Sequence, residues 1–463
     1  MATPRKRSST TLASFDAPLE ASPQRRAAGR TLRTTAPRTS QSEWTPAPDR
    51  RDPIEVLEES NLTRLPDLVP LRYSRMAASL FAFLRGSALV MAHDLATTPT
   101  SGLQVRLCGD AHIANFGIFN SPERRQVFDL NDFDETAPGP FEWDVKRLAA
   151  SIQVAGRENG LGASQVRSMV TGAIGTYCDW MATYSEMTQL DIWYAKLDVT
   201  ELMALLNPSS RSRKRTEANL RKAAAKNHLK ALDKLTVVTD GRHRFIDDPP
   251  LVQHLEGTEL QNRLEHLLSG YRTSLGADRQ ALFDHYRFVD FARKVVGVGS
   301  VGTRCWIVLF QGPNGGPLFL QVKEARPAAP QLAQGHSTKE HHGRRVVEGQ
   351  RMLQASSDVL LGWGTDDATG IHYFVRQLWD SKGSVDIAAM RPDSFATYAR
   401  ICGRALARAH ARTGDAVALS GYLGTSARFP EAIADFASEY ADQTERDHSA
   451  LVAAIASGRI AAE

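Results

Sequence analysis

One stretch of the chain, residues 107–135, gathers many side chains that can do chemistry, in the string LCGDAHIANFGIFNSPERRQVFDLNDFDE. The side chains of interest are Asp110, His112, Asn115, Asp129, Asp132 and Asp134. A carboxylate can orient a hydroxyl group and accept its proton, and carboxylate and amide oxygens are the ligands that Mg²⁺ prefers. The pattern therefore predicts phosphoryl transfer from ATP, with Mg²⁺ held between the protein and the nucleotide phosphates.

Each of these side chains has a predicted role. Asp110 is the candidate catalytic base. The candidate Mg²⁺ ligands are Asn115 and Asp132, with Asp129 and Asp134 as alternatives. His112 joins the catalytic group as a side chain that braces the loop, because no second histidine is spaced for a zinc site. Two alternative functions stay open: a metal-dependent hydrolase that uses the Asp/His cluster directly, and a module that binds nucleotide without transferring phosphate.

A glycine-rich loop lies more than 180 residues downstream, between two predicted strands. Its glycines are Gly297, Gly299 and Gly302. A strand follows this loop, whereas a dinucleotide-binding fold would require a helix, and strand-loop-strand is the arrangement of protein kinases. Such glycines let backbone N–H groups approach nucleotide phosphates, and Lys323 on a later strand is the candidate phosphate-binding lysine. A helical acid should pair with this lysine, and Glu348 is the candidate, with Glu340 as its rival.

The elements that must position these residues follow from hydrophobic periodicity and turn signals. The expected helices span residues 71–95, 340–355, 394–414 and 429–460, with mainly helical segments between 140 and 235, and the expected strands lie near 105–108, 116–119, 126–130, 292–312, 317–325 and 372–378. Asp144 is expected to brace the catalytic loop by accepting hydrogen bonds. Arg72, Arg75 and Arg85, on the helix that leads into the loop, either bind a phosphate or carboxylate of the substrate or pair with helix acids.

The composition is that of an ordinary globular protein, with 42% hydrophobic and 23% charged residues, and 463 residues exceed what one hydrophobic core usually serves. The four cysteines are isolated and form no zinc-binding pair, so we expect reduced, buried thiols: Cys108, Cys178, Cys305 and Cys402. No apolar run is long enough for a membrane span or placed for a signal peptide. These features predict a cytoplasmic protein.

The net charge of +4 is unevenly distributed, because residues 1–51 hold ten Lys or Arg against four acids. Residues 1–50 are rich in Ser, Thr, Pro and Arg, and they are predicted to be a disordered tail. Binding of nucleic acid is not expected outside this basic tail, and residues 211–234 form a second basic run that is typical of a solvated helix face. The expected partners are a nucleotide and a small molecule.

The order of the two patterns is unusual, because the catalytic half precedes the glycine-rich half. The string ALARAHARTG at 405–414 resembles the helix that comes directly before the catalytic loop of small-molecule phosphotransferases such as aminoglycoside kinases. In those enzymes a GDxHxxN loop follows that helix, and here the same loop lies at 109–115. We interpret this order as a circular permutation of a kinase-like chain.

Five strings together resemble a bacterial family called domain of unknown function 2252: RYSRMAASLFAFLRG, GDAHIANFG, NDFDETAPGPFEWDVKRLAAS, LQVKEA and RRVVEGQRMLQ. The resemblance covers nearly the whole chain after residue 50, but it brings no settled activity. The GDxHxxN and DFD strings are similar to those of kinase-like phosphotransferases, which implies a catalytic base at Asp110 and metal ligands at Asn115 and Asp132. One departure is Cys108, where phosphotransferases often have His, so the anchoring of the loop is expected to differ.

The predicted fold is therefore α+β and two-lobed: a permuted, protein-kinase-like arrangement of a large helical lobe and a small β-rich nucleotide-binding lobe. Residues 51–285 should form the helical lobe with the catalytic loop, 286–380 the small lobe, and 381–463 helices that return to the large lobe.

Overall fold

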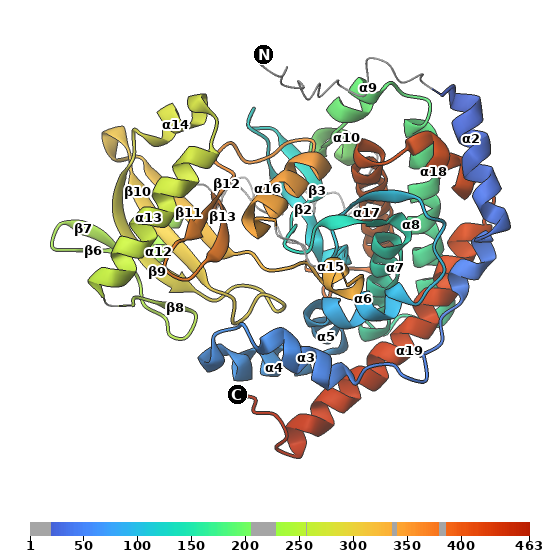
Figure 1. Ribbon diagram of the computed structural model, residues 1–463, viewed down its shortest axis with the longest axis horizontal. Coiled ribbons are helices and arrows are strands. Elements are labelled where there is room, and N and C mark those ends of the chain that lie inside the picture. The colour runs from blue at the N-terminus through green and yellow to red at the C-terminus, as the bar shows by residue number, and fades with distance from the viewer. Residues whose placement is uncertain (1–19, 205–227, 256, 336–339, 379–385) are drawn as a thin grey trace, which may run out of the picture.

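The computed structural model describes residues 20–204, 228–255, 257–335, 340–378 and 386–463. The protein is α+β, as predicted: a six-stranded sheet lies on one side, and long helices pack together on the other (Figure 1). Among the residues in these ranges, no helix combines the length and the apolar character needed to cross a membrane.

The large sheet is antiparallel throughout, in the order β12-β13-β11-β10-β9-β8. Its strands are β8 (Val252–Gln253), β9 (Arg287–Lys294), β10 (Cys305–Gln311), β11 (Pro317–Glu324), β12 (Gly362–Asp366) and β13 (Ile371–Gln377). β11 has a neighbour on each side and is buried along its whole length. In this strand Lys323 lies opposite Cys305 of β10 and Phe374 of β13. The sheet therefore holds Lys323 in a buried, fixed position.

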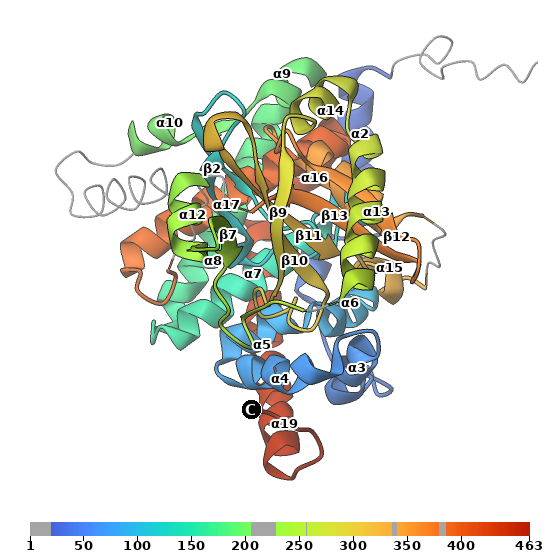
Figure 2. The same cartoon turned by 90° about the vertical axis from the view of Figure 1, so that its left-hand side faces the viewer.

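Three helices and a hairpin that precede β9 pack against this sheet. They are α12 (His228–Leu235), the hairpin of β6 (Thr236–Thr239) and β7 (Arg242–Phe245), α13 (Thr258–Ser274) and α14 (Ala277–Phe283). Figure 2 shows α13 running along the face of the sheet that is turned to the viewer. Tyr271 of α13 and Phe283 of α14 share a buried cluster with Phe310 of β10. The predicted boundary at residue 285 between the helical and β-rich parts is therefore too late in the chain.

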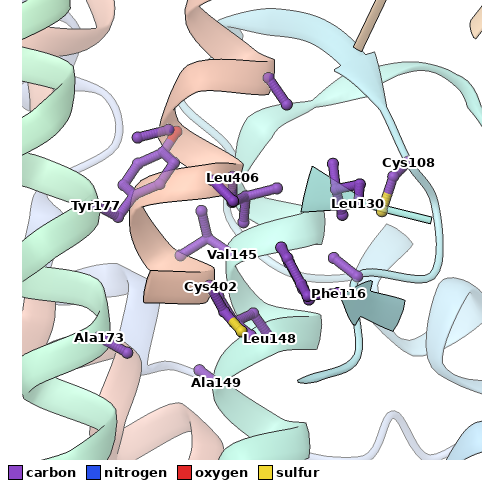
Figure 3. Close-up of a cluster of buried hydrophobic side chains, with 14 of the residues drawn as sticks. Cys108, Phe116, Leu130, Val145, Leu148, Ala149, Ala173, Tyr177, Cys402 and Leu406 are labelled. Atoms are coloured by element: carbon purple, nitrogen blue, oxygen red, sulfur yellow. The ribbon is translucent and has the colours of Figure 1, made fainter. Parts of the chain in front are cut away.

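The helical side has its own hydrophobic core. Its main helices are α7 (Phe141–Glu158), α8 (Ala163–Tyr184), α17 (Pro392–Thr413), α18 (Ala416–Leu423) and α19 (Arg428–Ala456). Figure 3 shows Leu148 of α7, Ala173 of α8 and Leu406 of α17 in one buried cluster. Gly403 lets α17 approach α8 closely, because a Cβ atom there would lie 2.2 Å from the carbonyl oxygen of Ala173. All four cysteines are buried free thiols, as predicted.

The predicted catalytic loop (residues 109–115) and its hairpin rest on this helical core. β1 (Gln104–Leu107) pairs with β4 (Ala137–Pro140), and β3 (Gln126–Leu130) lies between β2 (Phe116–Asn120) and β5 (Leu197–Asp198). The predicted hairpin is therefore confirmed. The predicted helices at 340–355 and 429–460 are also present, as α16 (His342–Leu353) and α19. Three short helices complete the described chain: α9 (Gln189–Tyr194), α10 (Val199–Ala204) and α15 (Ala329–Ala333). Most of the basic run at 211–234 lies outside the described residues.

The segment before the catalytic loop differs from the prediction, because the expected single helix at 71–95 is three short helices. After α3 (Pro53–Asn61) come α4 (Val69–Ala77), α5 (Leu80–Gly86) and α6 (Ala88–Ala96). Ser79 caps α5 by accepting a hydrogen bond from the N–H of Ala82 at 3.2 Å. Gly86 packs against Met76, where a Cβ atom would lie 2.6 Å from the methionine side chain. The two bends fold α4 back beside α5.

The predicted disordered tail is wrong for residues 20–50. Helix α2 (Ser22–Thr31) packs on α18, and Arg25 forms an ion pair with Asp415 at 2.6 Å. Arg33 and Arg38 donate hydrogen bonds to carbonyl oxygens in the last turn of α18. The last carbonyls of a helix have no partner within the helix. The arginines that made this segment look solvated therefore satisfy the end of another helix. Residues 1–19 lie outside the described residues.

Candidate functional site

A cavity lies where the helical side, the catalytic loop and the sheet meet. It is lined by Asp110, His112 and Asn115 from the loop, and by Asp132 and Asp134 from the segment after β3. The glycine-rich loop, residues 297–300, lines the same cavity from the sheet side. The structure thus brings together the two sequence patterns, although residues 136–296 separate them.

The catalytic loop is held by backbone contacts that its sequence requires. Gly109 has φ of +84°, and a Cβ atom there would lie 1.8 Å from the carbonyl oxygen of Glu135. The N–H groups of Cys108 and Gly109 donate to the carboxylate of Asp144 at 2.7 and 3.0 Å. His410 of α17 lies 3.3 Å from the same carboxylate. Asp144 therefore braces the loop, as predicted, and it anchors the position that Cys108 occupies.

Asp110 is oriented by a buried arginine that the sequence analysis did not single out. Arg147 of α7 donates from Nε to Asp110 Oδ1 at 2.8 Å. Burial raises the pKa of Asp110, and the charge of Arg147 opposes this rise without cancelling it. A general base works best when its pKa lies near the working pH. The sequence carried a signal for Arg147, because it follows Asp144 by three residues and so lies on the same helix face.

The other two side chains of the loop are fixed in different ways. Asn115 donates from Nδ2 to the backbone carbonyl oxygen of Asp110 at 2.8 Å, which leaves its side-chain oxygen available for a ligand. His112 is buried, with Nε2 3.7 Å from Asp110 Oδ2. Burial, together with the charges of Arg85 and Arg147, lowers the pKa of His112 well below its usual value. His112 is therefore a neutral side chain packed under the loop.

The lysine of β11 binds the aspartate segment directly. The Lys323 ammonium forms an ion pair with the carboxylate of Asp134, and only 3% of the lysine side chain is exposed. Burial alone would lower the pKa of Lys323, but Asp134 and Asp132 outweigh burial and raise it. Burial would likewise raise the pKa of Asp132, but Lys323 and Arg376 outweigh it and lower that pKa. The site thus holds a charged ammonium beside an ionised Asp132.

The Asp134 carboxylate has one oxygen in the ion pair with Lys323, and its other oxygen, Oδ1, is buried without a hydrogen-bond partner among the described residues. Burial, and then the charge of Asp132, raises the pKa of Asp134 to about 6, although Lys323 acts in the opposite direction. Two carboxylates and the amide oxygen of Asn115 match the set with which Mg²⁺ binds alongside nucleotide phosphates. Within the described ranges, no three or more His, Cys, Asp or Glu side chains form a group that could hold a metal ion.

Two predicted site residues lie elsewhere. Asp129 is an alternative metal ligand in the sequence analysis, but its carboxylate points into the helical core and pairs with Arg408 at 2.5 Å. Glu348 does not pair with Lys323; it pairs with Arg344 at 2.7 Å, one helical turn away on α16. Both faces of β3 are buried at this point, and Asp129 lies on the face where Arg408 of α17 meets the strand. Lys323 pairs instead with Asp134, on the segment after β3.

The residue of α16 that does reach the site is an arginine. Arg345 donates hydrogen bonds to the backbone carbonyl oxygens of Asp134, Thr136 and Arg326. The rival acid, Glu340, accepts a hydrogen bond from Gln331 at 2.7 Å. Helix α16 therefore supports the backbone of the site and supplies no acid to the lysine.

The glycine-rich loop is fastened to the helical side. Gly297 and Gly302 have φ of +67° and +85°, values that favour glycine. Arg75 of α4 donates to the carbonyl oxygen of Gly297 at 2.7 Å, and the Leu65 N–H donates to that of Gly302 at 2.8 Å. At Gly299 a Cβ atom would lie 3.0 Å from a carbonyl oxygen of α5. These contacts hold the loop at the cavity that the aspartates also line.

The comparisons with known proteins identify one family. The profile of the family described as "Uncharacterized protein conserved in bacteria (DUF2252)" matches residues 64–454. No curated protein and no solved structure matches the chain.

Proposed function

The chain belongs to the DUF2252 family of bacterial proteins, and we propose that it is an ATP- and Mg²⁺-dependent phosphotransferase with a circularly permuted, two-lobed, kinase-like fold. Its acceptor is a hydroxyl group of a small molecule. The observation that carries the proposal is the shared cavity, which Asp110, Asn115 and Asp132 line together with the glycine-rich loop. Lys323 is tied to the same aspartate segment by its ion pair with Asp134.

The permutation is supported by the neighbours of the catalytic loop. In the predicted parent order, the helix that ends at 414 would run directly into this loop. The end of α17 does lie beside β1, which leads into the loop, because the Arg106 N–H donates to the Thr413 hydroxyl at 3.2 Å. Gly414 packs closely against Val105. The two strings that the chain order separates are therefore neighbours in space.

The residues of the cavity suit the steps of phosphoryl transfer. Asp110, held by Arg147, is placed to hold the acceptor hydroxyl and to accept its proton. Backbone N–H groups of the glycine-rich loop and the Lys323 ammonium would bind the nucleotide phosphates. Asn115, Asp132 and Asp134 would hold Mg²⁺, which would neutralise charge on the transferring phosphoryl group. Because Asp129 faces Arg408, the alternative hydrolase has fewer carboxylates available to it.

Calorimetric titration with Mg·ATP tests the proposal. We expect binding to the native chain and loss of binding in Lys323→Met, with a folded state checked by thermal unfolding. Asp110→Asn should keep nucleotide binding but lose transfer to the acceptor, which separates an enzyme from a module that only binds nucleotide. Glu348→Gln is the matched control, because this acid lies outside the cavity and pairs with Arg344. If the native protein does not bind Mg·ATP, the kinase-like function is wrong.

A further inference from the structure

The cavity has a second set of charged side chains, of opposite sign to the aspartates. Four arginines line it: Arg64, Arg72, Arg85 and Arg326. They come from the turn after α3, from α4, from α5 and from the residues after β11. The bends that break the predicted helix at 71–95 are what bring Arg72 and Arg85 to one wall. Arg64 and Arg326 belong to none of the predicted site motifs. They lie 262 residues apart in the chain, so the sequence alone does not show that they meet.

Three of these arginines are held by neutral groups. Arg72 donates to the side-chain oxygen of Asn61 at 2.7 Å and to the Gly86 carbonyl oxygen at 2.9 Å. Arg64 and Arg326 both donate to the carbonyl oxygen of Ser60, at 3.2 and 2.8 Å. Among the ion pairs of the described residues, none includes any of the four. Hydrogen bonds therefore fix Arg64, Arg72 and Arg326, and no ion pair among the described residues compensates the charge of any of the four.

The crowding of these cations has an electrostatic cost. Burial lowers the pKa of Arg64, and the charges of Arg72 and Arg326 lower it further, while the carboxylates of Glu135 and Glu324, which line the same cavity, partly oppose this. Burial also lowers the pKa of Arg72 to about 10, and Arg326 contributes in the same direction. The Nε atoms of Arg72 and Arg85 are buried with no hydrogen-bond partner among the described residues. A buried cation without a partner is costly, and a bound anion relieves that cost.

We propose that Arg64, Arg72, Arg85 and Arg326 form a phosphate-binding subsite for the acceptor, so that the substrate is a phosphorylated small molecule; this inference rests on the proposed phosphotransferase function. A phosphate monoester carries almost two negative charges and three acceptor oxygens. As a ligand for several guanidinium groups, it is therefore better suited than a ligand with a single carboxylate. The subsite lies in the same cavity as Asp110. It would hold the acceptor by its phosphate while its hydroxyl meets the catalytic carboxylate.

Arg85 offers the sharpest test, because removing it breaks no hydrogen bond seen among the described residues. The probe is inorganic phosphate, titrated by calorimetry into the protein already saturated with Mg·ADP. We expect phosphate to bind, and Arg85→Gln to weaken its binding by about tenfold or more, as for a lost charge-assisted hydrogen bond. The affinity for Mg·ADP should stay within about twofold in this variant. Arg167→Gln is the matched control, since Arg167 pairs with Asp435 on the exposed surface and does not line the cavity.

Several outcomes would overturn the subsite. Competition between phosphate and Mg·ADP, or an equal loss of both affinities in Arg85→Gln, would assign the arginines to the nucleotide phosphates. Acetate binding as tightly as phosphate would assign them to a carboxylate, and absence of phosphate binding would refute an anion site. Phosphate binding that Arg85→Gln abolishes, in a protein that binds no Mg·ADP, would support the subsite and refute the nucleotide site. The two proposals can therefore fail separately.

Discussion

Two carboxylates of the same hairpin region, Asp129 and Asp134, each pair with a cation from a distant part of the chain, yet their surroundings differ. Asp129 pairs with Arg408 of α17, and the N–H groups of Leu130 and Ala355 donate to its two oxygens. Asp134 pairs with Lys323 of β11, but its Oδ1 has no partner among the described residues. The Asp129 pair joins the hairpin to the helical core, while the Asp134 pair joins it to the sheet and opens on the cavity.

The two carboxylates differ in whether they have an oxygen left for a ligand. A carboxylate whose oxygens are all satisfied inside the protein has no capacity left for a ligand, and its loss leaves a buried cation behind. A carboxylate with a free, buried oxygen beside a cavity is expensive to keep, which is typical of a site that binds something. We therefore expect substitutions at the two positions to affect different properties.

The largest expected effect on stability is at Asp129. Asp129→Asn should lower the free energy of unfolding by about 3–5 kcal/mol, because it leaves Arg408 buried without its counter-charge. Asp134→Asn should cost only about 1 kcal/mol, because Asp132 remains beside Lys323, but it should abolish Mg·ATP binding. Urea unfolding and calorimetry on both variants measure the two properties. Equal losses of stability would contradict the distinction between the two pairs.

Much of this contrast could be predicted from the sequence, and the rest could not, for physical reasons. The hairpin and the strand of Lys323 follow from local patterns of alternating apolar residues and turn residues. The direction of Asp129 depends on which face of β3 meets α17, and that contact joins segments about 280 residues apart. The predicted pairing of Glu348 with Lys323 is wrong because helical spacing shows which residues share a face but not which face meets the cavity. The prediction of disorder around the N-terminal arginines is wrong because their partners are carbonyl oxygens of α18, and composition does not reveal such partners.

A third buried cation, Lys146 of α7, extends the comparison to pH. It is fully buried, and its Nζ has no hydrogen-bond partner among the described residues. Burial lowers the pKa of Lys146 to about 8, although Glu142 opposes the shift. In the unfolded chain a lysine titrates near pH 10.4. Between these values the unfolded state binds more protons, so the free energy of unfolding should rise with pH, by up to about 3 kcal/mol.

Lys146→Met should remove this rise, and unfolding curves between pH 7 and about 10.5 would show the difference between the native protein and the variant. The variant should also be no less stable than the native protein at pH 7, since an unpaired buried charge is replaced by an apolar side chain of similar length. A rise of the same size in both proteins would assign it to other groups.

The Asp134–Lys323 pair should make the binding of Mg·ATP sensitive to acid. Asp134 has a folded pKa of about 6, above the ordinary value of 3.8, so the folded protein holds this proton more tightly than the unfolded chain. Its contribution to stability therefore falls as pH rises from about 4 to 6. A cation competes with the same proton, so the affinity for Mg·ATP should be constant above pH 7 and about tenfold weaker at pH 5. Calorimetry across this range should show a fall in the Mg·ATP affinity of the native protein as the pH drops below about 6. If the affinity instead varies between pH 8 and 7 and is constant below pH 7, then Asp134 is not the group responsible.

The smallest effect is expected at Glu348, which tests the corrected partner of the lysine. Its carboxylate pairs with Arg344 on the surface of α16, and such i, i+4 pairs contribute about 0.3–0.5 kcal/mol. Glu348→Gln should therefore change the free energy of unfolding by about 0.5 kcal/mol or less and leave the Mg·ATP affinity unchanged. If the substitution weakens nucleotide binding as strongly as Lys323→Met does, then α16 moves when nucleotide binds and brings its acid to the lysine. In that case the Asp134 pair would be the resting partner of Lys323, exchanged for Glu348 in the bound state.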